Sequence, residues 1–216
     1  MGPCRLTKPG QVGLCGATAD VVASRNLARA VAAGCAAHSD HGRDLALTLL
    51  AVAKGEAPDY KVRDVNKLMN VAQVLGVPTK DRPVNEIAEE VASRALSAFG
   101  QQTGEIPYAS RAPRKRQEIW RKLRIVPRGI DREVVEILHR TNVGNDQDPE
   151  HILRQTMRTA LADGWGGSML GTDISDILFG TPSPILVKSN LGALSRDEVN
   201  IVVHGHEPTL SDMILT

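Results

Sequence analysis

The sequence predicts a mainly α-helical domain that is followed by the beginning of a Rossmann-like α/β domain. Apolar side chains recur every three or four positions over much of residues 18–162, which is the period of amphipathic helices. The pattern changes after Pro182 and Pro184, where the β-branched run VNIVV at 199–203 is bounded by polar and Gly residues, as a buried strand is. We therefore expect three segments, a Gly/Pro-rich loop at 1–17, a helical domain at 18–183, and the first strand and helix of a truncated Rossmann-like domain at 184–216.

Six helices are expected in the first domain, at 18–37, 40–54, 62–75, 83–98, 130–141 and 149–162. Thr18 or Asp20 is a candidate N-cap for the first helix. Asp148 and Pro149 form an N-cap and first-turn pair for the last helix, and Gly164 is expected to end it.

Residues 100–116 are expected to form an exposed loop, because Gly104, Pro107 and Pro113 interrupt any regular pattern. The loop ends in a basic run, RAPRKR at 111–116, which we interpret as a solvated surface rather than a binding patch. The formal net charge of the whole chain is only +1, which argues against a nucleic-acid-binding protein.

The composition is typical of a globular chain, with 216 residues of which 42% are hydrophobic and 24% charged. Only 3% are aromatic, so the core must consist mainly of Ala, Val, Leu and Ile. No apolar run approaches the roughly 20 residues of a transmembrane helix, and residues 1–15 lack the apolar stretch of a signal peptide. Because both ends interrupt a motif or an element, we expect an internal piece of a longer polypeptide.

The three cysteines favour a reducing compartment over a disulfide framework, because their number is odd. Cys4 and Cys15 lie in the Gly/Pro-rich loop, whose flexible backbone could wrap around a metal cluster. A cubane [4Fe–4S] cluster takes four thiolates and the loop offers two, so a pair of ordinary free thiols remains the alternative. Cys35 follows Gly34 in an apolar helix and is expected to be a small buried residue.

Two pairs of histidines are candidate functional residues. His38 and His41 are three residues apart, so they share one face if the segment is helical. They could transfer protons, bind a metal, or only cap and decorate a helix. His204 and His206 follow the predicted strand, and a neutral imidazole there suits nickel or iron, although a loop histidine bonded to backbone is the alternative.

The glycine-rich stretch DGWGGSML has neither the G-x-G-x-x-G fingerprint nor a P-loop, so we do not expect a nucleotide site. Gly164, Gly166 and Gly167 are expected to let the backbone approach another group closely. His139 and His151 lie within helical patterns, and we interpret them as structural.

Taken in order, seven stretches resemble the catalytic subunit of the anaerobic nickel–iron–sulfur carbon monoxide dehydrogenases. They are MGPCRLT, GLCGATADVVASRNLARAVAAG, AAHSDHGRD, PRGIDREVVEILHRT, DGWGGSM, DILFGTP and VNIVVHGHEP. Each stretch alone is weak evidence for the family, but the order that the seven share over nearly the whole chain is specific to it. The resemblance implies a prismane/CO dehydrogenase-like fold and a fragment of the catalytic subunit.

The resemblance also implies roles for the cysteines and the first histidine pair. Cys4 and Cys15 match the last two of four cysteines that bind a [4Fe–4S] electron-relay cluster, and the first two would precede residue 1. His38 and His41 match histidines that line a route for proton release.

The second histidine pair matches the segment of the family that binds the active centre. His206 is implied as a ligand to iron in the [Ni-4Fe-4S] cluster, with His204 the less favoured choice. The cysteines that complete this centre would follow Thr216, so the fragment alone is expected to be inactive.

The implied reaction oxidises CO with water to CO2 and passes two electrons to a ferredoxin-like acceptor. The resemblance further implies a cytoplasmic homodimer, with any membrane association made through partner proteins, and it leaves open whether an acetyl-CoA synthase is a partner. Two alternatives are a hybrid-cluster protein or hydroxylamine reductase, and a non-catalytic electron-transfer relative. The stretches AAHSDHGRD and DILFGTP favour the dehydrogenase over the hybrid-cluster protein.

Overall fold

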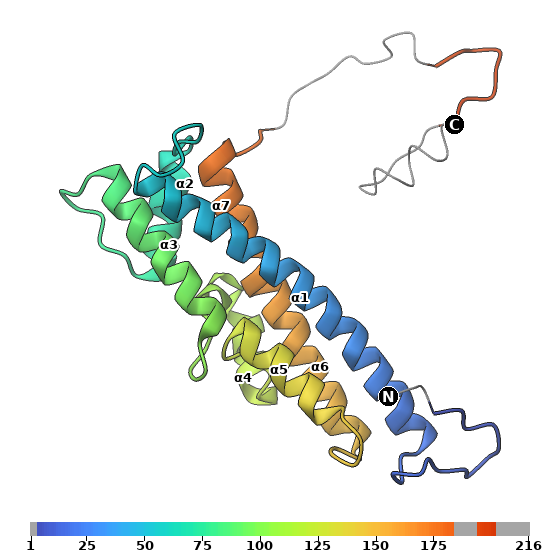
Figure 1. The fold of residues 1–216 in the computed structure, drawn as a ribbon. Helices are drawn as coiled ribbons and strands as arrows, with labels where there is room; N and C mark the ends of the chain where they lie inside the picture. Colours follow the sequence, from blue (N-terminus) through green and yellow to red (C-terminus); the bar gives the residue numbers. More distant parts are fainter. Residues whose placement is uncertain (1–3, 184–193, 202–216) are drawn as a thin grey trace. The chain divides into compact units, whose positions relative to one another are not determined.

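The computed structural model describes residues 4–183 and 194–201, and the chain divides into two compact units, Met1–Thr181 and Pro182–Thr216. The described part of the first unit is helical and has no strand, as Figure 1 shows. Its elements in order are α1 (Ala19–Ala53), α2 (Val65–Leu75), α3 (Val84–Gly100), the 3-10 turn η1 (Pro107–Arg111), α4 (Arg114–Leu123), α5 (Ile130–Arg140), α6 (Pro149–Ala162), the π-helical turn η2 (Asp163–Ser168) and α7 (Met169–Phe179). None of the described helices is long and apolar enough to cross a membrane.

The helix α1 is continuous over 35 residues, about 53 Å, where we expected two helices at 18–37 and 40–54. The expected break between residues 37 and 40 is absent because these residues stay α-helical. The expected N-cap at Thr18 is confirmed, since its side chain accepts a hydrogen bond from Val21 N at 3.4 Å.

The helices α2 and α3 begin and end close to the expected positions. Asp64 caps α2 by accepting a hydrogen bond from Lys67 N at 2.8 Å. Gly76 ends α2 with a φ of 70°, a left-handed conformation that glycine adopts without strain. Pro83 precedes α3 as its N-cap residue, one position earlier than its expected place in the first turn.

The helix α6 has the bounds that the sequence predicts, Pro149–Ala162, but the chain does not leave the helical path at Gly164. The helix α6 starts as expected, with Pro149 in its first turn and Asp148 Oδ1 accepting a hydrogen bond from Glu150 N at 2.8 Å. The chain then continues through η2 into α7, two elements that the sequence did not lead us to expect. The helical path is held in place by four fully buried apolar residues of α7, Leu170, Ile174, Ile177 and Leu178.

The expected loop at 100–116 contains η1 and the start of α4. The helix α4 is mostly charged and packs against the rest of the domain through the buried Trp120. The Trp120 ring lies edge-on against Trp165, with 5.5 Å between the ring centroids. The basic residues 114–116 lie on its exposed surface, as expected of a solvated run.

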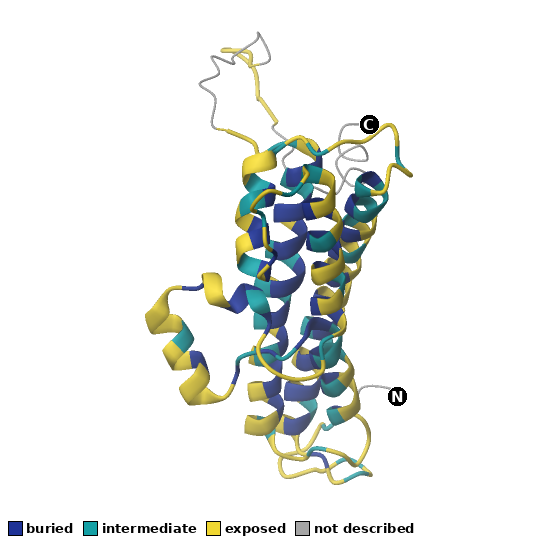
Figure 2. Cartoon of the chain, turned by 90° about the vertical axis from the view of Figure 1, so that its left-hand side faces the viewer, coloured by how far each residue is buried: buried dark blue, intermediate teal, exposed yellow. Residues whose placement is uncertain are grey.

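The core lies along α1, which contacts α3, α5, α6 and α7, and α2 packs against α3 and α7 (Figures 1 and 2). Small side chains allow α1 and α3 to approach closely, and the buried alanines that share their core cluster are Ala46, Ala88, Ala92 and Ala95. The expected Ala/Val/Leu/Ile core is therefore present, and Phe99 and Tyr108 add two buried aromatic rings.

The described residues of the second unit do not test the predicted α/β domain. Residues 199–201 form no strand, and Asn200 Oδ1 instead accepts a hydrogen bond from Ser195 N at 2.7 Å. The rest of the predicted strand and the following helix, residues 202–216, lie outside the described residues.

Candidate functional site

The loop at residues 4–17 precedes α1 and carries both candidate cluster ligands (Figure 1). Cys4 is exposed, and its Sγ lies 3.5 Å from the position that a Cβ at Gly13 would occupy. Gly13 N donates to Ala17 O at 2.8 Å, and Gly16 N donates to Gly13 O at 2.9 Å. The Cys4 sulfur therefore packs against the same tight turn that contains Cys15.

The thiol of Cys15 has a pKa below its ordinary value. The main cause is a hydrogen bond from the backbone N–H of Ala17, and the second is donation by Arg25, whose Nη1 lies 3.8 Å from Sγ. These donors stabilise the thiolate, which is the form of cysteine that binds metals.

The connection between α5 and α6 braces the cysteine loop. Gln147 Nε2 donates to Cys15 O at 2.8 Å, and Arg25 Nη2 donates to Asp146 O at 2.6 Å. The Cys15 backbone and its neighbouring cation are thus held by residues more than 100 positions away in the sequence.

The chemistry of this loop fits part of a [4Fe–4S] ligand set. It provides two thiols at one turn, one of them with a stabilised thiolate, and glycine backbone beside the sulfur. A cubane cluster takes four thiolates, so the loop can supply half of them. Within residues 4–183 and 194–201 no three His, Cys, Asp or Glu side chains gather as a complete metal site.

His38 and His41 line one groove on α1, as expected from their spacing. His38 Nδ1 lies 2.7 Å from Asp163 Oδ1 at the start of η2, and Ser168 Oγ donates to the same oxygen at 3.3 Å. The groove has a volume of about 260 Å³ and is lined by His38, His41, Gly42, Leu45, Gly167, Ser168, Gly171, Thr172 and Ser175. Both imidazoles are exposed, so the groove can exchange protons with water.

Glycines form the floor of this groove by letting η2 and α7 touch α1. A Cβ at Gly167 would lie 3.2 Å from Ser39 N, and one at Gly171 would lie 3.1 Å from Gly42 Cα. The close approach expected of Gly164, Gly166 and Gly167 is made by two of them, since Gly166 meets the side chain of Ile130 and Gly167 meets the backbone of α1. The prediction is wrong for Gly164, which has open space at its Cβ position.

Cys35 takes no part in either site. Its side chain is fully buried in the core, as expected, and burial raises the pKa of its thiol to about 12. A thiol in this state is neutral and unreactive at neutral pH.

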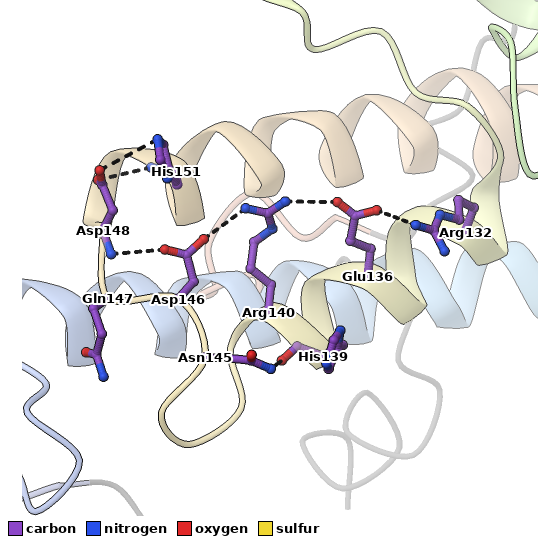
Figure 3. Close-up of a pocket in the computed structure, with 9 residues that line it drawn as sticks. All are labelled: Arg132, Glu136, His139, Arg140, Asn145, Asp146, Gln147, Asp148 and His151. Atoms are coloured by element: carbon purple, nitrogen blue, oxygen red, sulfur yellow. Dashed lines mark hydrogen bonds and ion pairs between the residues drawn. The ribbon is translucent and has the colours of Figure 1, made fainter.

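A charged pocket of about 800 Å³ lies where α5 leads into α6, and its residues are Arg132, Glu136, His139, Arg140, Asn145, Asp146, Gln147, Asp148 and His151 (Figure 3). Arg140 lies between Glu136 and Asp146, at 3.0 and 2.9 Å. Burial alone would raise the pKa of Glu136, but Arg128 and Arg140 outweigh it and lower the value to about 2. Because these charges satisfy one another, we interpret the pocket, with His139 and His151 on its wall, as structural.

Sequence reasoning missed Arg25 and Asp163, which contact the candidate ligands and histidines. Arg25 is 10 residues from Cys15 and meets it because the loop folds back onto α1, whereas Asp163 is 125 residues from His38 and meets it through the packing of the bundle. No local spacing signals such pairs. The second histidine pair, His204 and His206, lies outside the described residues, so its role stays a prediction.

The fold and site define a helical-bundle domain with a paired-thiol loop at the start of its longest helix and a histidine groove along that helix. The model of the Prismane/CO dehydrogenase family matches residues 1–216, and the chain belongs to this family.

Its relatives include carbon monoxide dehydrogenase 1 of Methanosarcina mazei, which is 51% identical over 100% of this chain and 35% of the relative. Carbon monoxide dehydrogenase 2 of Carboxydothermus hydrogenoformans is 43% identical over 100% of this chain and 34% of the relative. The chain thus spans about a third of the length of the curated relatives it matches.

Solved structures show the same fold. A nickel-free carbon monoxide dehydrogenase from Thermococcus sp. AM4 matches with a TM-score of 0.83 and 48% identity, over 100% of this chain and 35% of that chain. An acetyl-CoA synthase/carbon monoxide dehydrogenase matches with a TM-score of 0.82 and 39% identity, over 99% of this chain and 32% of that chain. The expected prismane/CO dehydrogenase-like fold is confirmed for the chain.

Proposed function

We propose that the protein containing this chain is an anaerobic carbon monoxide dehydrogenase, which oxidises CO with water to CO2 and releases two protons and two electrons. The observation that carries the proposal is 51% identity along the whole chain to a carbon monoxide dehydrogenase, together with the thiol loop and the histidine groove. The relatives found are carbon monoxide dehydrogenases, which favours this activity over a hybrid-cluster protein or a non-catalytic relative.

The cysteine loop serves as half of an electron relay in this proposal. Cys4 and Cys15 bind a [4Fe–4S] cluster together with two cysteines from elsewhere in the full-length protein. The donors to Cys15 Sγ favour the thiolate and so favour ligation. The electrons leave to a ferredoxin-like acceptor.

The histidine groove serves as a proton exit. When His38 Nδ1 donates to Asp163, Nε2 is left as the proton acceptor, and His41 on the same face is the next group in the groove. A carboxylate that holds one ring nitrogen keeps the imidazole in one orientation, so proton transfer does not require the ring to reorient.

His206 is our proposed iron ligand in the [Ni-4Fe-4S] cluster, with His204 as the less favoured choice; both lie outside the described residues. The bound metals supply CO binding and activation of water. We further propose that the enzyme is a cytoplasmic homodimer. One structural relative is an acetyl-CoA synthase/carbon monoxide dehydrogenase, which supports an acetyl-CoA synthase as a candidate partner.

The test is CO-dependent reduction of a viologen dye by the full-length protein, measured anaerobically after growth with and without nickel. We expect reduction that depends on nickel, and none from the 216-residue chain alone, which lacks most of the ligands. A cluster-loaded protein that reduces no dye with CO but reduces hydroxylamine would contradict the proposal and favour the hybrid-cluster alternative.

A further inference from the structure

A buried arginine beside the cysteine loop makes an unusual set of contacts. Arg25 is only 7% exposed, and its guanidinium contacts the Cys15 sulfur through Nη1 and the carbonyl oxygen of Asp146 through Nη2. Its Nε is buried and has no hydrogen-bond partner, and no carboxylate forms an ion pair with it in the part of the chain that the structure describes.

A buried cation without an anion is unfavourable, because desolvation of the charge is not compensated. The neighbouring sulfur can supply the missing negative charge when it is a thiolate that binds a cluster. A [4Fe–4S] cluster with four thiolate ligands is an anion that becomes more negative on reduction, and nearby charge and N–H···S hydrogen bonds set its reduction potential.

We propose that Arg25 is a positioning residue of the electron relay, which holds Cys15 by an N–H···S hydrogen bond and raises the reduction potential of the cluster bound there. This inference rests on the proposed function, because it requires the cluster. Arg25 acts from a fixed position, since its second nitrogen is bonded to the α5–α6 connection at 2.6 Å. The guanidinium fork can reach a sulfur and a carbonyl oxygen at once, which a lysine ammonium cannot do with the same geometry.

The experiment is a redox titration of the full-length protein, followed by EPR of the reduced [4Fe–4S] signal that disappears in Cys15→Ala. The variant Arg25→Gln keeps side-chain donors but removes the charge. We expect its cluster to be about tenfold harder to reduce at a given potential, which for one electron is a shift of about 59 mV to more negative values.

The matched control is Arg29→Gln. Arg29 lies one turn further along α1 and donates Nη2 to Thr141 O at 2.6 Å, so it makes the same kind of carbonyl contact without a sulfur. The cluster in Arg29→Gln should have the same reduction potential as the cluster in the wild type. An unchanged potential in Arg25→Gln, or an equal shift in both variants, would overturn the inference.

If Arg25→Gln fails to bind the cluster, Arg25→Met and Arg29→Met, which also remove the charge, are compared in its place. A negative shift in the Arg25 variant alone supports the inference, and no shift refutes it. A wild-type protein without any cluster that depends on Cys15 would instead contradict the proposed function, so the two failures can be distinguished.

Discussion

At the scale of single residues, two cysteines of the same chain have thiols whose pKa values differ because their surroundings differ. Cys15 has a thiol whose pKa is lowered by hydrogen-bond donors, whereas burial raises the pKa of Cys35 to about 12. Sequence context predicted that Cys35 is buried, because it lies in an apolar helix, but it did not predict the lowered pKa of Cys15. That pKa depends on Arg25, which meets the sulfur only because the loop folds back onto α1, and the contact of Asp163 with His38 depends on how distant elements pack.

The histidine groove gives a prediction about proton transfer. In the full-length protein, His38→Ala should slow CO oxidation by roughly a hundredfold, the lower end of the usual range for a proton-transfer group. Asp163→Asn should act in the same direction, because it removes the carboxylate 2.7 Å from Nδ1. Turnover and metal content are measured together, with the exposed His139→Ala as control. Loss of nickel in His38→Ala would indicate a structural role instead.

Glu136 gives a prediction about acid stability. Its folded-state pKa is about 2, below its ordinary value of 4.5, so its contribution to the free energy of unfolding is complete above about pH 4.5 and is lost as pH falls toward 2. Glu136→Gln should therefore lower Tm at about pH 6 and have less effect at about pH 3. Thermal unfolding of both proteins checks this, with the exposed Glu118→Gln as control. An equal loss of Tm at both pH values would contradict the assignment.

At the scale of elements, amphipathic periodicity predicted six helical stretches but misjudged where helices stop. A break was expected between residues 37 and 40, where α1 instead runs on. The helix α6 ends at Ala162 as expected, but the chain continues through the π-helical turn η2, whose residues Gly166 and Gly167 pack closely against Ile130 and α1. The helix α4 was missed because it is mostly charged and has a single buried apolar residue, Trp120.

Two glycines that look alike in the sequence should respond oppositely to substitution. Gly171→Ala should destabilise the protein by about 1–3 kcal/mol, because the new Cβ would lie 3.1 Å from the backbone of Gly42. Gly34→Ala should stabilise it by about 0.5–1 kcal/mol, since Gly34 is helical and has open space at the Cβ position. Chemical denaturation of the full-length variants measures both. A neutral Gly171→Ala would show that α1 and α7 can separate without cost.

At the scale of the whole molecule, the chain holds only part of each proposed metal site. It matches about 35% of the length of its relatives, and its loop provides two of the four thiolates that a cubane cluster takes. The order of motifs predicted the family and the helical domain. The Rossmann-like start at 184–216 stays a prediction, because a strand is defined by its pairing and most of this segment lies outside the described residues.

The central claim is that this chain carries an electron-relay cluster on Cys4 and Cys15, and the most direct measurement is the cluster content of the full-length protein. Iron analysis and EPR of the reduced wild type are compared with Cys15→Ala, with Cys35→Ala as control. We expect Cys15→Ala to lose one [4Fe–4S] cluster per chain and most CO-dependent dye reduction, and Cys35→Ala to keep both. Unchanged iron content and an unchanged EPR signal in Cys15→Ala would contradict the account.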